Sequence, residues 1–264
     1  MASSSSRTGL LVLGTAIVCV FGSVACSSED GDAPSHREPD PLGAGKRIRE
    51  VVNPSLKTQG DVDVTGAEVI YIDTFDETQD GKSRGTIYVQ DVGSQAPYSG
   101  ISLYSPSFIP SSLRVSPGDV LDLRGPYVEM QDIGTAHFPT GHKLPQLSTP
   151  IGTFRYETPP PAPVEINATD LNDYDTGRKW LNMLVTIKNV TVSDTPFPSG
   201  KRLSVHITSN TTRDAVTITN EFYDVQAADI AKDTKFASVT GIVTWFFNYH
   251  VVPRSPADLE LAAP

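Results

Sequence analysis

Cysteine is almost absent from this chain, whose 264 residues include two, Cys19 and Cys26. Everything after them lacks cysteine, so no disulfide can hold a domain in that part together. Long hydrophobic runs are also missing: the stretch 10–22 is shorter than the roughly 20 residues of a membrane-spanning helix. No nucleophile-elbow, Walker, dinucleotide-binding or His-Glu-x-x-His pattern occurs. We therefore expect a protein that is not an enzyme and that holds no cofactor and no metal.

The composition favours strands over helices and an acidic surface. The chain has 21 prolines and 20 glycines, and they are scattered between short apolar runs, a pattern typical of many turns and short strands. Its 31 acidic residues outnumber 21 basic residues, which gives a formal charge of −10. A surface of this sign repels phosphate backbones and anionic membranes and keeps an exported protein soluble.

The first residues have the order of a secretory signal peptide. A polar start with Arg7 precedes the apolar run 10–22. Small residues then stand directly before Cys26, an arrangement that resembles the bacterial lipobox, although Ser23 occupies a position where that box usually has leucine. The resemblance implies cleavage after residue 25 and lipid attachment at Cys26. An ordinary signal peptide with an incidental cysteine is the alternative.

Lipid attachment sets the expected location and the layout of the chain. Several acyl chains anchor a protein stably, because each buried CH₂ contributes about 0.8 kcal/mol. In Gram-negative bacteria, Ser27 after the lipid-bearing residue implies the outer membrane, facing the periplasm or the cell surface. The predicted divisions are a signal peptide (1–25), a flexible Pro-, Gly- and Asp-rich tether (26–45), a first barrel (46–158), a stiff proline linker (159–163) and a second barrel (164–264).

The first barrel is predicted from alternating patterns. Ile87 and Val89 alternate with polar or aromatic neighbours, and the same period of two returns in later segments. Gly66 stands inside the first long strand and indicates a bend, which an OB barrel needs because its first strand curves across both halves. The expected strands are 61–75, 85–91, 99–105, 120–130 and 147–157.

The second barrel repeats this cadence after Trp180. Apolar positions slip by one residue near Asn189, which predicts a bulge there. A short helix is expected over 225–232 with Asp224 as its cap, at the place where an OB fold has its helix. The fold class is therefore all-β, with two tandem five-stranded Greek-key barrels of the OB type and one short helix in the second.

The segments 85–91, 99–104, 118–125, 180–192 and 238–259 resemble the paired OB modules of secreted bacterial nucleases and related lipoproteins. In that family the modules are non-catalytic and precede a metal-dependent nuclease domain. No such domain follows in this sequence, so the resemblance carries over the fold and no catalysis. It implies a possible nucleic-acid ligand.

The candidate ligand-binding residues lie on outward positions of expected strands. OB folds bind oligonucleotides and oligosaccharides on the face of strands 2 and 3, where aromatic rings stack on the ligand. Tyr88, Gln90 and Tyr104 occupy that face in the first barrel, and His206 occupies it in the second. The alternative is the ordinary preference of tyrosine for strands. The aromatic run 245–249 is expected to pack against the first barrel.

Acidic and histidine clusters give weaker indications. The acidic loop 73–81 begins like a calcium loop, but Ile87 stands where the closing glutamate belongs, so a solvated turn is favoured. A second acidic group, 170–175, has the same interpretation. His137 and His142 lack a third zinc ligand nearby.

The function predicted from these features is that of a membrane-anchored, non-catalytic lipoprotein that binds or scaffolds at the cell envelope. Its expected partners are the membrane, a nucleic-acid, glycan or protein ligand, and a separately encoded partner enzyme. The alternative is extracellular single-stranded nucleic-acid binding, or a role as accessory subunit of a nuclease or hydrolase.

Overall fold

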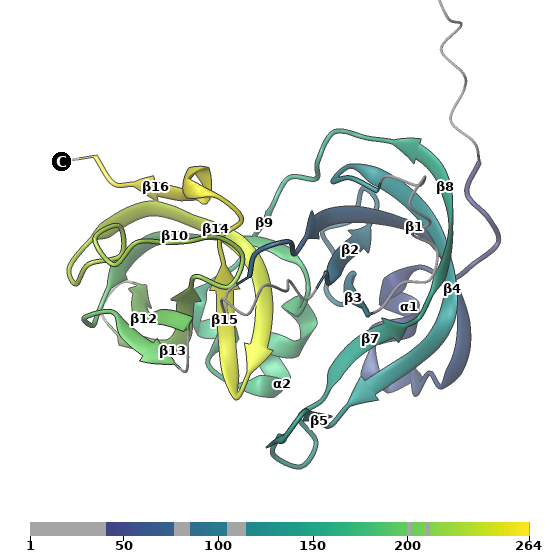
Figure 1. Ribbon diagram of the computed structural model, residues 1–264, viewed down its shortest axis with the longest axis horizontal. Coiled ribbons are helices and arrows are strands. Elements are labelled where there is room, and N and C mark those ends of the chain that lie inside the picture. Colours follow the sequence, from purple (N-terminus) through teal and green to yellow (C-terminus); the bar gives the residue numbers. More distant parts are fainter. Residues whose placement is uncertain (1–40, 77–84, 105–114, 200–201, 210–211, 264) are drawn as a thin grey trace, which may run out of the picture. The chain divides into compact units, whose positions relative to one another are not determined.

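A computed structural model describes residues 41–76, 85–104, 115–199, 202–209 and 212–263 (Figure 1). The predicted signal peptide, Cys26 and the start of the tether lie outside these residues, as does much of the acidic loop. Among the described residues, none of the helices combines the length and the hydrophobicity that a membrane-spanning segment needs. The elements are α1 (Ile48–Val52), η1 (Pro54–Leu56), β1 (Gly60–Ile72), β2 (Ile87–Asp91), β3 (Gly100–Tyr104), β4 (Asp119–Met130), β5 (Asp132–Ile133), β6 (Ala136–His137), β7 (Leu144–Ser148), β8 (Ile151–Glu157), β9 (Val164–Glu165), η2 (Ala168–Leu171), α2 (Tyr174–Gly177), η3 (Arg178–Trp180), β10 (Leu184–Val192), β11 (Phe197–Ser199), β12 (Arg202–Ser209), β13 (Thr212–Thr219), β14 (Lys235–Phe246), β15 (Asn248–Val252), η4 (Pro256–Asp258) and β16 (Leu259–Leu261).

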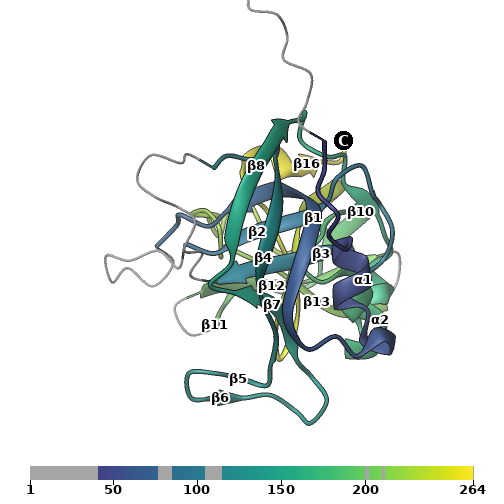
Figure 2. The same ribbon diagram turned by 90° about the vertical axis from the view of Figure 1, so that its right-hand side faces the viewer.

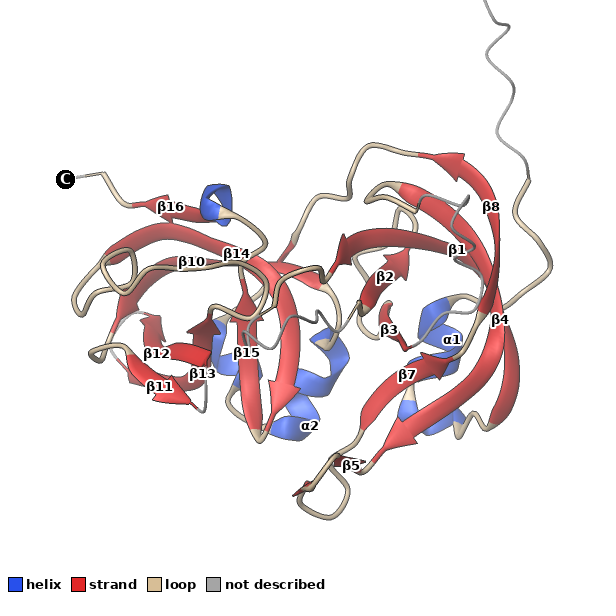
Figure 3. Ribbon diagram, viewed as in Figure 1, coloured by secondary structure: helices blue, strands red, loops and turns tan. Residues whose placement is uncertain are grey.

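Two closed five-stranded barrels make up the fold. Figure 3 shows their strands in red. In the first, β1 pairs with β2, β2 with β3, β3 with β7, β7 with β4, and β4 again with β1. In the second, β10, β12, β13, β15 and β14 close in the same order. In each barrel the third and fifth strands are parallel and the other pairs are antiparallel. This order is compatible with OB-like folds, so the predicted all-β class with two barrels is confirmed.

Alternation along the strands builds a separate core in each barrel. Ile87 and Val89 of β2 point into the first barrel and are fully buried. Val205 and Ile207 of β12 do the same in the second. Each such side chain removed from water stabilises the fold by about 1.5–3 kcal/mol.

The first strand of each barrel bends at a residue with a left-handed backbone. In β1 this residue is Gly66 (φ +67°), and the register with β4 shifts between Val64 and Ala67. A Cβ at position 66 would lie 2.7 Å from the Arg47 guanidinium. In β10 the residue is Asn189 (φ 54°), but the register with β14 runs through it unchanged. The bulge predicted at Asn189 is therefore wrong: the residue has a left-handed backbone, but the register does not shift there.

The fifth strand of the first barrel is broken into two parts. Both β7 and β8 pair with β4, and Thr149 (φ 45°) and Pro150 interrupt them. Only β7 closes the barrel by pairing with β3, while β8 continues along β4 toward the proline segment (Figure 2).

Short helical segments stand before the first strand of each barrel and contribute to its core. In the first barrel, α1 buries Ile48 and Val51, and the Asp91 carboxylate accepts hydrogen bonds from the backbone N–H groups of Ile48 (2.6 Å) and Arg49 (3.1 Å). A carboxylate at a helix N-terminus satisfies donors that have no partner within the helix. In the second barrel, η2 buries Leu171.

The short helix of the second barrel is α2, which begins at Tyr174 and continues into η3. It lies before the first strand, whereas the sequence placed a helix at 225–232 with Asp224 as its cap. That segment forms turns in the structure. Its apolar residues Val225 and Ile230 are nevertheless buried in the core of the second barrel, so the apolar pattern reports burial and the assignment of a helix was wrong.

Candidate ligand-binding faces

The strand 2–3 face of the first barrel is covered by residues of the second barrel. Tyr88 points outward from β2, as its position in the alternation predicts, but it is 9% exposed. It belongs to an apolar cluster with Ile70 of the first barrel and Leu184, Phe222 and other residues of the second. Tyr88 therefore offers little surface to a dissolved ligand.

Phe222 is the centre of this contact. Its ring stacks on Tyr71 with centroids 4.5 Å apart and meets Tyr88 at 5.3 Å. The Tyr71 hydroxyl donates a hydrogen bond to the Phe222 carbonyl oxygen at 2.9 Å. Burial chiefly raises the pKa of Tyr71 to about 12, with the Asp73 carboxylate contributing. The two tyrosines of the first barrel thus pack against Phe222 of the second barrel.

Gln90 is also part of this junction and is fully buried. Its Oε1 accepts a hydrogen bond from the backbone N–H of Leu184 at 3.1 Å, and its Nε2 donates to the Ser94 carbonyl oxygen at 2.8 Å. Nearby, a Cβ at Gly100 would lie 2.5 Å from the carbonyl carbon and oxygen of Asn182. The expectation that Tyr88 and Gln90 lie on an accessible face is corrected, because the second barrel occupies that face.

Tyr104 is the member of the predicted set that remains accessible on the first barrel, with 55% of its surface exposed. It ends β3 and lies beyond the residues buried in the junction. The two tyrosines lie on the same side of adjacent strands, since Tyr88 pairs with Ser102, but they differ in exposure because the second barrel covers Tyr88. Ligand binding by either residue stays a prediction.

The equivalent face of the second barrel carries His206, whose side chain is 23% exposed. Its Nδ1 lies 3.0 Å from Oδ2 of Asp194, and its ring stacks on Phe197 with centroids 5.1 Å apart. Asp194 lies in the turn after β10, and Phe197 begins β11. The sequence analysis missed both partners, because short loop residues carry no periodic pattern.

Beyond His206, the outward side of the second barrel's strands continues into a row of polar side chains that are buried, with Thr217 2% and His250 6% exposed. Thr217 pairs with His206 and with His250, and His250 pairs with Thr244. Glu221, which follows β13, binds Arg202 at 2.9 Å, lies 3.5 Å from Nδ1 of His250 and accepts a hydrogen bond from Thr244 at 3.0 Å. The negative charge of Glu221 is thus matched by Arg202.

The aromatic run 245–249 contacts the first barrel, as the sequence suggested. Phe138, in the segment after β6, meets Trp245 edge-on at 4.4 Å and Phe247 at 5.3 Å. Trp245 is 5% exposed and Phe247 is 52% exposed. This second contact uses none of the residues of the Phe222 cluster, so it is a further attachment between the barrels.

Charged and polar contacts strengthen the junction around α2. Arg178 of η3 forms an ion pair with Glu129 and donates to the Lys143 carbonyl oxygen at 3.0 Å. Its own pKa is raised, because the phenol of Tyr174 and the carboxylate of Glu129 outweigh the opposing effect of burial. The ring of His142 stacks on Tyr174 at 4.1 Å. His142 therefore has a packing role in this junction.

The other sequence candidates have structural roles. Asp173 caps α2 by accepting a hydrogen bond from the backbone N–H of Asp175 at 2.9 Å, and Asp170 pairs with Lys179. His137 pairs with Asp132 within the β5–β6 hairpin. Within the part of the chain that the structure describes, no three His, Cys, Asp or Glu residues form a group able to hold a metal ion.

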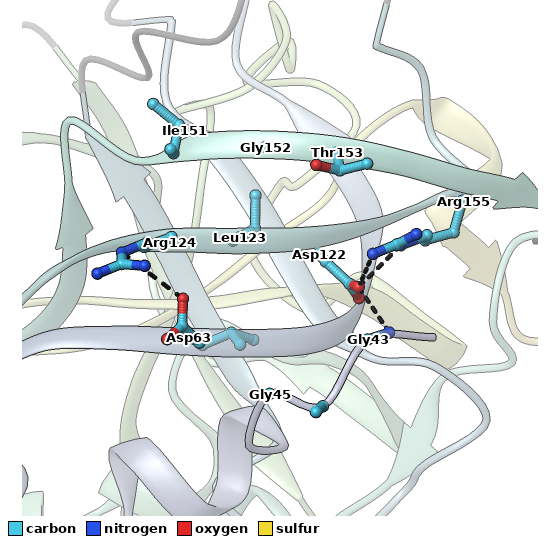
Figure 4. A pocket seen from close by; sticks show the side chains of 12 residues that line it. Gly43, Gly45, Asp63, Asp122, Leu123, Arg124, Ile151, Gly152, Thr153 and Arg155 are labelled. Carbon is cyan, nitrogen blue, oxygen red and sulfur yellow. Dashed lines mark hydrogen bonds and ion pairs between the residues drawn. The ribbon is translucent and has the colours of Figure 1, made fainter. Parts of the chain in front are cut away.

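A hollow of about 400 Å³ lies on the first barrel between residues 43–45 and strands β1, β4 and β8 (Figure 4). Asp122 is its central charge and accepts hydrogen bonds from Gly43 N–H (2.7 Å), the Thr65 hydroxyl (2.6 Å) and Arg155 Nε (2.8 Å). Arg124, at the other end, lies 3.7 Å from Asp63. The two arginines that line the hollow, Arg124 and Arg155, are each paired with a carboxylate. The hollow therefore has no unmatched charge to attract an ionic ligand.

No protein-family model matches this chain, and no curated protein matches it either.

Proposed function

We propose that this protein is a membrane-anchored, non-catalytic binding module of the cell envelope, in which the second barrel presents the ligand-binding face and the first barrel supports it. The lipid anchor would be attached at Cys26. The proposal that the module is non-catalytic comes from the sequence, which carries none of the catalytic motifs named above.

One observation carries this assignment of roles. The strand 2–3 face of the first barrel is buried around Phe222, whereas His206 on the same face of the second barrel keeps 23% of its side chain exposed. OB barrels use this face for oligonucleotides and oligosaccharides. A ligand that approaches the second barrel there meets the Phe197–His206 stack and the hydroxyl group of Thr208.

The chemistry of this face suits a neutral oligosaccharide better than a nucleic acid. His206 faces Asp194, and Arg202 is bound by Glu221, so the basic groups on the face are matched by acids. Binding of a phosphate backbone needs an excess of basic groups, and the formal charge of the chain is −10. A ring stack beside hydroxyl and carboxylate groups offers a sugar both an apolar platform and hydrogen-bond partners.

An array of neutral oligosaccharides, with a labelled single-stranded DNA oligomer as comparison, tests the proposal. We expect oligosaccharide binding that is insensitive to salt and weakened at least about tenfold by His206→Ala. Tyr104→Ala is the matched control, since it removes an exposed aromatic ring from the first barrel. DNA binding that weakens with salt and depends on Tyr104 would overturn the proposal in favour of the nucleic-acid alternative, and an unchanged His206→Ala variant would remove the assignment to the second barrel.

A further inference from the structure

The second barrel has a cavity at a place unrelated to the face around His206. It measures about 380 Å³ and lies between the turn segment 223–234, which includes the residues expected to form a helix, and the segment 256–261. Eight residues line it, and six are apolar or aromatic.

Asp229 and Thr234 are the two polar members of this lining, and the other six are Tyr223, Ala228, Phe236, Pro256, Leu259 and Leu261. Phe236 forms the floor and belongs to the core of the second barrel, while Tyr223 and Leu259 pack against that core. Leu261 is 66% exposed at the edge of the cavity. The volume of the cavity lies within the range of natural small-molecule sites, which are typically apolar with a few polar groups that orient the ligand.

Two carboxylates, those of Asp229 and Asp258, act on Tyr223 in the wall of the cavity. Burial raises the pKa of Tyr223 to about 12, and the carboxylates of Asp229 and Asp258 contribute to this rise. Asp258 is itself bound by the Arg254 guanidinium at 2.9 Å, so Asp229 is the carboxylate of the cavity lining that can face a ligand. The segments 222–236 and 254–261 together carry three Asp, two Lys, one further Asp, one Glu and one Arg, which gives five acidic against three basic residues, a net charge of −2.

We propose that this cavity binds a small organic cation with an apolar body, such as an aromatic or alkyl ammonium compound. The apolar lining takes the body of the ligand, and Asp229 at the rim pairs with its positive charge. The face of Tyr223 adds an attraction for the cation, since aromatic rings attract ammonium groups placed over them. An anionic ligand of the same shape meets repulsion from Asp229.

Three probes of similar size and different charge test this proposal on the purified full chain. They are tryptamine, a cation at neutral pH, tryptophol, which is neutral, and indole-3-acetate, an anion. Chemical-shift titration of the isotope-labelled protein at low salt measures each affinity and locates the site. We expect shifts around Tyr223, Asp229 and Phe236, and a tryptamine affinity at least about tenfold above that of indole-3-acetate.

Two variants and a control separate this site from a general effect of the acidic surface. Asp229→Asn should reduce the preference for the cation to about twofold or less, and Ala228→Leu should fill the cavity and weaken all three probes. Asp224→Asn removes an exposed carboxylate that does not line the cavity, and it should preserve the preference. Equal affinities of the three probes, shifts located elsewhere, or no binding at millimolar concentration would each overturn the proposal. His206→Ala should leave binding unchanged, so failure here and failure of oligosaccharide binding are distinguishable.

Discussion

On the first barrel, the outward side of β2 carries Tyr88 and Gln90, and both are buried against the second barrel. On the second barrel, the outward side of β12 carries His206 and Thr208, and both remain partly exposed. The strand order of the two barrels is the same, so topology does not account for this difference. The difference follows from the outward side chains. The tyrosine ring and the amide on β2 suit a contact that excludes water and has few hydrogen bonds. The histidine and the hydroxyl group on β12 suit contact with water or with a polar ligand.

The largest effect is expected where the second barrel enters the face of the first. Phe222→Ala removes a ring that is 3% exposed and stacked on Tyr71, so it should lower the free energy of unfolding by about 3–5 kcal/mol. Phe247→Ala, at a residue that is 52% exposed, is the control and should cost less than about 1 kcal/mol. Denaturant unfolding measures both, and equal losses would contradict the central role of Phe222.

The second effect concerns Glu68, a residue that is 2% exposed on the outward side of β1 and is paired in register with Gln90. Burial raises its pKa from 4.5 to about 7, and a hydrogen bond from the Thr158 hydroxyl opposes this rise. Because the folded chain holds this proton more tightly than the unfolded chain, the stabilisation is fully present below pH 4.5 and is lost as the pH rises through 7.

The expected loss of stability over this pH window is on the order of 2–3 kcal/mol. Glu68→Gln keeps a neutral side chain at every pH, so it should flatten this part of the pH profile and should be the more stable form above pH 7. Unfolding measured from pH 4 to 8 checks both statements. A variant with the same profile as the original chain would show that another group titrates.

A smaller effect is expected at Asp122, on the side of the first barrel that the second barrel leaves uncovered. Burial raises its pKa, but hydrogen bonds from Thr65, Gly66, Gly43 and Arg155 outweigh burial and hold the pKa below its ordinary value. The stabilisation is therefore present above pH 3.8 and is lost as the pH falls through the folded-state pKa. Asp122→Asn should cost about 1–2 kcal/mol near neutral pH, measured by thermal unfolding, and should reduce the loss of stability in acid. A neutral result would mean that residues 43–45 are held by other contacts.

The smallest effect is expected for Tyr104→Ala, which should change stability by less than about 0.5 kcal/mol because the side chain is 55% exposed. Tyr88→Ala, on the neighbouring strand, should cost several times more. The two residues have equivalent positions in the sequence pattern, so this pair isolates the contribution of the second barrel. Equal effects in denaturant unfolding would indicate that Tyr88 is not held by that contact.

The period of two was sufficient to predict the inner faces of the strands, and hence the two barrels, because side-chain direction alternates locally. The bend at Gly66 was also predictable, since a glycine inside a strand has a local conformational meaning. The helix at 225–232 was not correctly predicted, because a short apolar pattern fits buried turns and a helix equally well.

The candidate site was harder to predict than the fold. The alternation correctly assigns Tyr88 to the outer face, but no local pattern tells whether an outer face is covered by another domain. Phe222, which covers it, lies 134 positions further along the chain and outside any strand. Asp194 and Phe197 were missed for the same reason, since their relation to His206 arises only when separate segments meet.

The close approach of Gly100 to Asn182 has a consequence for how the sequence can vary. A single methyl group at position 100 would lie 2.5 Å from the main chain of Asn182, so one of the two main-chain segments would have to shift. The absence of a side chain at position 100 therefore allows the main chains of the two barrels, each with its own core, to approach this closely. Gly100→Ala would therefore perturb the contact between the barrels with one carbon atom, while leaving every aromatic and charged contact residue in place.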